Sequence, residues 1–119
     1  MTVGLAEVER AREVVRGHVH RTPLLSSRSL GERIGAVAHL KAENLQRTGS
    51  FKVRGATNAL AALSNEQRRA GIVTMSAGNH AQAVAYAARA LGLAVIVAMP
   101  EMLFDSREAM AAACSRTPA

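Results

Sequence analysis

The fold is decided by residues 71–99, which read GIVTMSAGNHAQAVAYAARALGLAVIVAM. Two apolar runs rich in β-branched residues, 71–75 and 93–99, flank a strongly helix-forming segment at 81–91. A strand, a helix and a strand in this order predict a βαβ unit with parallel strands and a right-handed crossover. The unbroken apolar run at 93–99 is typical of a strand buried on both faces. We therefore expect an α/β fold, with a three-layer parallel-sheet core between flanking helices.

Two helices are predicted near the N-terminus. Apolar residues recur at helical spacing over 5–16, and Gly17 follows as a stop signal. The spacing of Ser29 and Glu32 is that of a capping box, which predicts a short helix up to Ile34, closed by Gly35.

The middle of the chain predicts a strand and two further helices. Residues 37–43 alternate well enough for a strand, and residues 53–63 carry apolar side chains at helical spacing. Ser64 and Gln67 have a second capping spacing, which begins a short helical segment through Ala70.

Composition indicates one soluble domain at most. The chain has 119 residues, of which 49% are hydrophobic and 20% are charged. Its longest apolar stretch, 91–99, is too short to span a bilayer. The single cysteine, Cys114, excludes an internal disulfide and fits a reducing compartment, so we expect a cytoplasmic protein with no membrane partner.

The net charge of +6 raises the possibility of nucleic-acid binding. The arginines are scattered, however, and only Arg68 and Arg69 are adjacent, without aromatic residues between them to stack on bases. We expect a solvated surface and no nucleic-acid partner. His18 and His20 lack the further ligands that a metal site needs, so no metal is expected.

Lys52 is unusual in this sequence because only Lys41 and Lys52 are lysines, whereas thirteen residues are arginines. A lysine amine can lose its proton and form an imine, which an arginine cannot do. An exposed lysine on a first helical turn is the alternative interpretation.

A second candidate loop, Ser76-Ala77-Gly78-Asn79-His80, joins a predicted strand end to a helix start. Free amides and the helix dipole favour an anion there, and Gly78 allows a ligand to approach the backbone closely. Asn79 either orients a ligand or merely caps the helix. Neither loop is a G-x-G-x-x-G, Walker A or G-x-S-x-G motif.

The two loops together carry a resemblance. Residues 43–56, ENLQRTGSFKVRGA, followed by residues 76–82, SAGNHAQ, resemble the threonine/serine dehydratases (threonine ammonia-lyases). These are fold-type II, tryptophan-synthase-β-like enzymes that depend on pyridoxal 5'-phosphate (PLP). The resemblance covers roughly residues 18–101.

The resemblance implies a role for each candidate residue. Lys52 would hold PLP and act as the base at the substrate Cα, Phe51 would pack near the pyridine ring, and Asn79 would bind the phenolic oxygen of the ring. The loop that binds the substrate carboxylate would consist of Ser76, Ala77, Gly78, Asn79 and His80. The expected reaction is β-elimination from threonine or serine, giving a 2-oxo acid and ammonia, and the parent family is expected to be homo-oligomeric.

Ala77 separates this reading from serine racemase, which shares both loops. The racemase has a serine at this position that acts as the base on the opposite face, and a methyl group cannot move a proton. Serine racemase or another fold-type II PLP lyase remains the alternative, as does a non-catalytic remnant or partner protein.

The resemblance also implies what is missing. The family's glycine-rich phosphate loop has no counterpart here, since the nine glycines never cluster. We expect residues 1–101 to be the N-terminal part of such an enzyme, inactive alone. Residues 102–119 are expected to be an aberrant or frameshifted tail.

Overall fold

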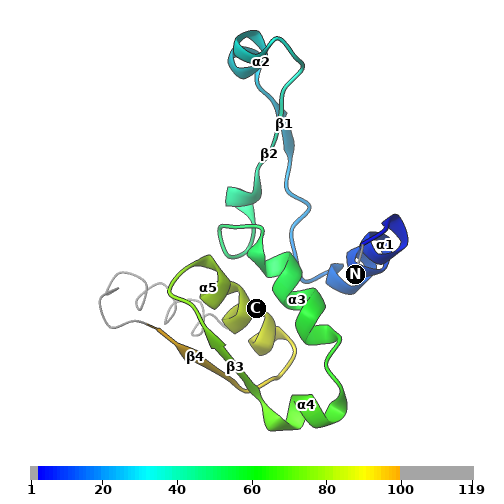
Figure 1. The fold of residues 1–119 in the computed structure, drawn as a ribbon, viewed down its shortest axis with the longest axis vertical. Helices are drawn as coiled ribbons and strands as arrows, with labels where there is room; N and C mark the ends of the chain where they lie inside the picture. The colour runs from blue at the N-terminus through cyan, green and yellow to red at the C-terminus, as the bar shows by residue number, and fades with distance from the viewer. Residues whose placement is uncertain (1–2, 100–119) are drawn as a thin grey trace.

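The computed structural model describes residues 3–99, which form a compact body and a projecting arm (Figure 1). The elements in chain order are α1 (Leu5–Val15), β1 (Leu24–Ser26), α2 (Arg28–Ile34), β2 (His39–Lys41), the 3-10 helix η1 (Glu43–Leu45), α3 (Lys52–Ala61), α4 (Asn65–Ala70), β3 (Ile72–Met75), α5 (Asn79–Ala90) and β4 (Val95–Ala98).

The predicted βαβ unit is confirmed. Strands β3 and β4 pair in parallel, with Ile72 opposite Val95 and Met75 opposite Ala98, and α5 connects them. Gly71, with φ of +80°, turns the chain into β3, and an added Cβ there would lie 3.4 Å from the Ala94 oxygen.

The core lies between α3 and α5. It consists of the buried side chains Val53, Ala56, Leu60, Ala83, Val84, Ala87 and Ala88. Five alanines of α5 are among the most buried residues of the described chain, and their small side chains allow the two helices to approach closely. Val53 is fully buried, which fixes the first turn of α3 on its apolar side.

The helix predictions hold, with one corrected cap. Ser64 and Gln67 form the expected capping box at the start of α4. The predicted helix ending at Ile34 is α2, and Gly35 closes it in the left-handed conformation. Its N-cap is Ser27, whose hydroxyl accepts a hydrogen bond from the Leu30 amide; Ser29 lies inside the helix, so the predicted Ser29 cap is wrong.

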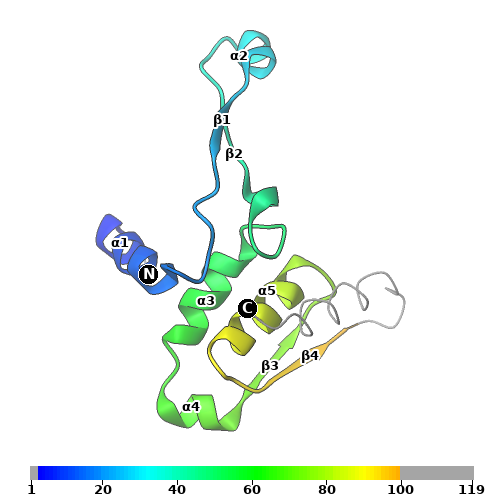
Figure 2. The same ribbon diagram turned by 180° about the vertical axis from the view of Figure 1, so that it is seen from behind.

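The arm is an antiparallel hairpin that carries α2 at its tip, and both views show it standing clear of the body (Figures 1 and 2). Strand β2 lies within the predicted strand at 37–43, whereas β1 was not predicted from the sequence. Leu24, Leu25 and Leu40 are 48–62% exposed on the arm.

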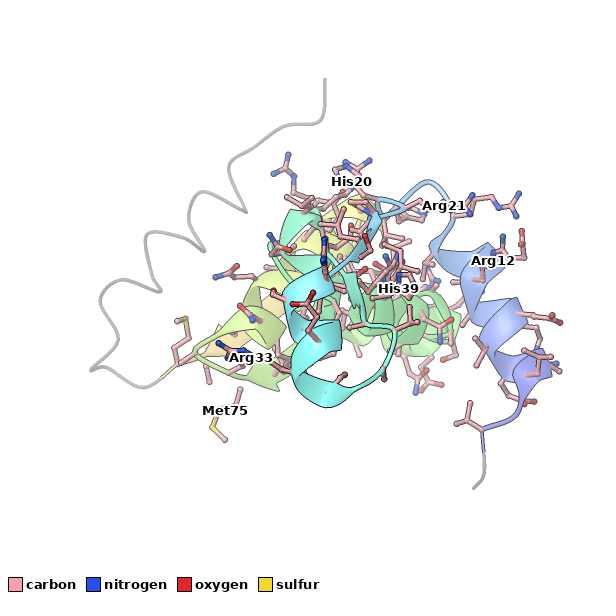
Figure 3. All side chains as sticks on the ribbon, turned by 90° about the horizontal axis from the view of Figure 1, so that it is seen from above. Arg12, His20, Arg21, Arg33, His39 and Met75 are labelled. Atoms are coloured by element: carbon pink, nitrogen blue, oxygen red, sulfur yellow. The ribbon has the colours of Figure 1, made fainter. Side chains whose placement is uncertain are left out.

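The expectation that the 93–99 strand is buried on both faces is wrong for the described residues. Burial alternates along β3 and β4, and Val73, Met75 and Ile96 are 67–80% exposed on the face away from α5. The Met75 side chain points away from the body (Figure 3). Helices α3 and α5 thus cover one face of this sheet, and nothing in residues 3–99 covers the other.

No helix within residues 3–99 has the length and apolar character needed to cross a membrane. The predicted tail at 102–119 lies outside the described residues.

Candidate functional site

A groove of about 440 Å³ opens between the start of α3, strand β3 and the first turns of α5. Its lining is mostly apolar, with three side chains capable of hydrogen bonding. The lining residues are Phe51, Lys52, Gly55, Ala56, Ala59, Leu60, Ile72, Val73, Thr74, His80 and Val84. The groove thus joins the Lys52 segment to the segment around His80.

Lys52 is the first residue of α3 and is exposed to the groove. Its Nζ lies 5.0 Å from the centroid of the Phe51 ring, a cation–π contact. Among the described residues, Lys52 makes no ion pair or side-chain hydrogen bond, so its amine is available to a ligand. Phe51 itself is 58% exposed, an apolar ring beside an uncommitted amine.

The loop between β3 and α5 is shaped by Ser76, whose Oγ accepts a hydrogen bond of 3.3 Å from the Gly78 amide. Gly78, and not Asn79, is the N-cap of α5, so the interpretation of Asn79 as a mere cap is wrong. No side chain caps the helix within the described residues, and a Cβ at Gly78 would meet nothing within 4 Å. The first turn of α5 therefore lacks a side-chain cap, and the helix dipole favours an anion at this end.

His80 lies at the groove end of α5, and its Nε2 is 3.2 Å from the Thr74 hydroxyl on β3. This bond fixes the imidazole against the sheet. Thr74 was not singled out in the sequence, because a threonine in a strand is an ordinary β-former.

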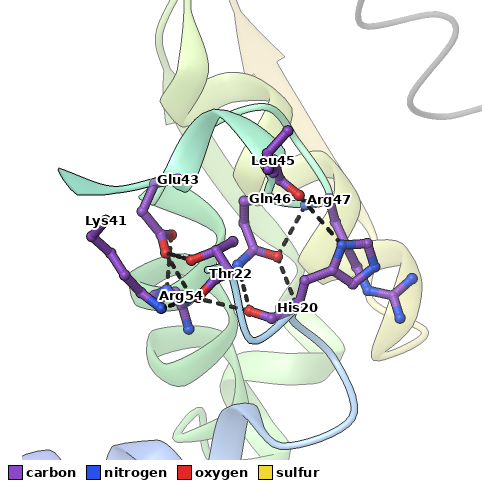
Figure 4. A network of polar contacts seen from close by, with 8 residues as sticks. All are labelled: His20, Thr22, Lys41, Glu43, Leu45, Gln46, Arg47 and Arg54. Atoms are coloured by element: carbon purple, nitrogen blue, oxygen red, sulfur yellow. Dashed lines mark hydrogen bonds and ion pairs between the residues drawn. The ribbon is translucent and has the colours of Figure 1, made fainter. Parts of the chain in front are cut away.

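A polar network fastens the segment that leads to Lys52 (Figure 4). The Glu43 carboxylate accepts hydrogen bonds from Arg54 Nε at 2.9 Å and Nη2 at 2.7 Å, and from the Thr22 hydroxyl. Arg54 Nη2 also donates to the His20 oxygen at 3.1 Å. The network therefore ties η1, the connector at 18–23 and the first turn of α3 together.

Gln46 completes the same network from the other side. Its side-chain Nε2 donates a hydrogen bond of 2.9 Å to the backbone oxygen of His20. Its side-chain Oε1 accepts hydrogen bonds from the backbone amides of His20 at 2.7 Å and Arg47 at 3.0 Å. Lys41 Nζ donates a hydrogen bond to the backbone carbonyl oxygen of Thr22. Gln46 and Thr22 are buried, so these bonds satisfy polar groups that are largely removed from water.

The ion pair between Glu43 and Arg54 shifts the pKa of both side chains. Hydrogen bonds from Arg54 lower the pKa of Glu43 from 4.5 to about 2, against the opposing effect of burial. The same contact raises the pKa of Arg54. The motif at residues 43–56 contains both Glu43 and Arg54, but they are eleven residues apart and the sequence did not predict the ion pair between them.

The comparisons with known proteins agree with this geometry. A family model described as pyridoxal-phosphate dependent enzyme matches residues 15–115. The chain belongs to this family.

Relatives within the PLP-dependent family include enzymes with different reactions. The chain is 47% identical over 105 residues to a putative threonine dehydratase of Sinorhizobium fredii, covering 88% of this chain and 32% of the relative. It is 50% identical over 94 residues to an L-threo-3-hydroxyaspartate ammonia-lyase of Pseudomonas sp, covering 79% and 30%.

The fold is similar to that of solved members of the family. Serine racemase from Dictyostelium discoideum matches with a TM-score of 0.86 and 37% identity, covering 95% of this chain and 38% of that one. The chain therefore has the fold of part of a fold-type II PLP enzyme, as the sequence predicted. The chain spans about a third of the length of the curated relatives it matches.

The residues present fit PLP. The uncommitted Lys52 amine can form the covalent link, and the exposed Phe51 ring offers an apolar surface to a flat heterocycle. Asn79 and the open α5 N-terminus supply polar donors next to the groove. The structure brings Phe51, Lys52 and His80 to one groove, while Ser76, Ala77, Gly78 and Asn79 form the adjoining loop.

Proposed function

We propose that this chain carries the lysine and the carboxylate-binding loop of a PLP-dependent enzyme that removes water and ammonia from threonine or serine. The observation that carries the proposal is the groove in which the uncommitted Lys52 amine and the N-terminal end of α5 meet. It is supported by relatives that include threonine dehydratase.

Each residue has a distinct task in this proposal. Lys52 holds the cofactor through its amine and, once released, takes the proton from the substrate Cα. The α5 N-terminus and the loop 76–80 bind the substrate carboxylate through backbone amides and the helix dipole. Phe51 packs against the cofactor ring, and Asn79 donates a hydrogen bond to its phenolic oxygen. Bound PLP supplies an electron-withdrawing ring that stabilises negative charge at Cα.

Ala77 offers no group that could return a proton to the opposite face of Cα. This supports elimination over racemisation.

Two alternatives have their own support. Serine racemase is favoured by the structural match to the Dictyostelium enzyme, and another fold-type II lyase by the hydroxyaspartate ammonia-lyase relative. A non-catalytic remnant or partner protein is the remaining alternative.

We further propose that the 119-residue chain alone has no turnover, because the groups expected to bind the PLP phosphate are not in it. Residues 1–101 are then the enzyme-like part. The family match extends to residue 115, so the coding DNA decides whether 102–119 is a frameshifted tail. A cytoplasmic location and a homo-oligomeric parent enzyme also remain proposals.

The test adds PLP to the purified protein and then offers threonine and serine. We expect a yellow absorption band that is present in the wild type and in Lys41→Ala but absent in Lys52→Ala. Release of 2-oxobutanoate or pyruvate reports turnover, and interconversion of serine enantiomers reports the racemase alternative. A protein that gives none of these signals is the remnant.

A further inference from the structure

We propose that Thr74 on β3 is a positioning residue that holds the His80 imidazole in the tautomer with its proton on Nδ1. In this tautomer His80 donates a hydrogen bond to a carboxylate bound at the N-terminal end of α5. The inference rests on the proposed function and deepens it, because it concerns how the same loop recognises the substrate carboxylate. It assigns a role to Thr74, which the sequence did not single out.

The hydrogen bond between Thr74 and His80 joins two elements that form the groove. His80 is the second residue of α5, Thr74 is the third residue of β3, and both side chains line the groove. Thr74 Oγ1 lies 3.2 Å from His80 Nε2. Thr74 alternates along β3 with the exposed Val73 and Met75, so its side chain lies on the half-buried face of the strand. Nε2 is therefore held against the sheet, and Nδ1 is the ring nitrogen left for a ligand.

The direction of this hydrogen bond follows from what each group can donate. A threonine hydroxyl has one proton, and a neutral imidazole has one N–H and one lone pair. Within residues 3–99 the Thr74 hydroxyl has no other hydrogen-bond partner. If the hydroxyl donates to Nε2, its proton is paired and the imidazole proton lies on Nδ1. In the reverse arrangement a half-buried hydroxyl keeps an unpaired donor, so the first arrangement is favoured.

An anion at the start of α5 favours the same tautomer. No side chain caps α5 within the described residues, and its dipole favours a carboxylate beside the first turn, where His80 lies. An Nδ1–H group donates to that carboxylate, whereas an Nδ1 lone pair would repel it. The dipole alone opposes an N–H group at its positive end, but this effect is small at an exposed residue and is screened by salt.

Nitrogen NMR of the free protein reads the tautomer directly. In about 0.15 M salt at about pH 8.5, above the usual titration range of histidine, long-range proton–nitrogen correlations distinguish a protonated from an unprotonated ring nitrogen. The His80 signals are assigned by their loss in His80→Gln, and we expect Nδ1–H as the major tautomer in the wild type. His20 is an internal reference, since its Nδ1 lies 3.4 Å from the Leu45 carbonyl oxygen, which can only accept a proton.

Three variants separate positioning from packing. Thr74→Val keeps the shape of the side chain but removes the donor, so the ratio of Nε2–H to Nδ1–H at His80 should rise about threefold to tenfold. Thr74→Ser retains a hydroxyl and should give the wild-type ratio. The matched control is Thr57→Val, which removes a buried hydroxyl of α3 that does not line the groove and should leave the ratio unchanged.

Acetate then tests the donor role of His80. Each protein is titrated with acetate at constant ionic strength, and the amide signals of the first turn of α5 give the dissociation constant. We expect acetate to bind about threefold more weakly to Thr74→Val than to the wild type, because one hydrogen bond to the carboxylate is weakened. Thr74→Ser should bind acetate as the wild type does.

The inference is overturned by Nε2–H as the major His80 tautomer of the wild type, or by an unchanged ratio in Thr74→Val. Acetate that does not distinguish the wild type from Thr74→Val also overturns it. The wild-type tautomer decides alone if Thr74→Val does not fold. The expected tautomers and acetate affinities in a protein that never captures PLP keep this inference and reject the proposed function, whereas PLP capture with the wrong tautomer rejects the inference alone.

Discussion

Replacing Glu43 by Gln should destabilise the protein in a pH-dependent way. The pKa of Glu43 falls from 4.5 to about 2 in the folded chain, because Arg54 and Thr22 donate hydrogen bonds to its carboxylate. At 1.36 kcal/mol per pKa unit, this depression corresponds to an upper bound of about 3 kcal/mol. Arg54 is 34% exposed and solvent screens part of the interaction, so we expect a loss of about 1–2 kcal/mol at pH 7.

The pH dependence follows from the sign of the shift. A carboxyl group whose pKa is lower in the folded state stabilises fully above its unfolded pKa and loses that contribution as the pH falls through its folded pKa. Urea unfolding should therefore give a wild-type advantage over Glu43→Gln that is constant above about pH 5 and disappears towards pH 2. An advantage under 0.5 kcal/mol at pH 7, or one that stays constant down to pH 2, refutes the reasoning. The control is Glu32→Gln, which breaks the exposed ion pair between Arg28 and Glu32.

Three further substitutions test the core and the groove. Val53→Ala should lower the free energy of unfolding by about 2 kcal/mol in urea melts, because Val53 is fully buried between α3 and α5; a loss under 0.5 kcal/mol contradicts this packing. Thr57→Val should raise the free energy of unfolding by about 1 kcal/mol, since the buried Thr57 hydroxyl has no hydrogen-bond partner among residues 3–99; a loss in thermal melts indicates a bonded hydroxyl. Gly55→Ala should stabilise α3 by about 0.5–1 kcal/mol, with nothing within 4 Å of the new Cβ, yet weaken PLP capture by narrowing the groove; unchanged capture removes Gly55 from the site.

Local patterns were enough to predict the elements of the body. The βαβ unit follows from two β-branched runs around an alanine-rich helix, and the Ser64–Gln67 spacing correctly gave the cap of α4. Lys52 at the start of α3 also followed from local sequence. Each of these features is decided by residues a few positions apart.

Features that depend on distant residues were not predicted. The Arg54 contacts to Glu43 and His20 span 11 and 34 residues, and no local pattern encodes them. The three-residue strand β1 is too short to show an alternation. The apolar run at 93–99 predicted burial on both faces, but burial of the second face needs a covering layer that the described residues do not include.

The central claim, that Lys52 is the cofactor-binding amine, is tested most directly by trapping. The protein is incubated with PLP, reduced with borohydride and digested, and the modified lysine is identified by mass spectrometry. Lys41 is the matched control because it is the only other lysine and already donates to the Thr22 oxygen. The account predicts preferential modification of Lys52 at limiting PLP, and equal modification of both lysines, or preference for Lys41, would contradict it.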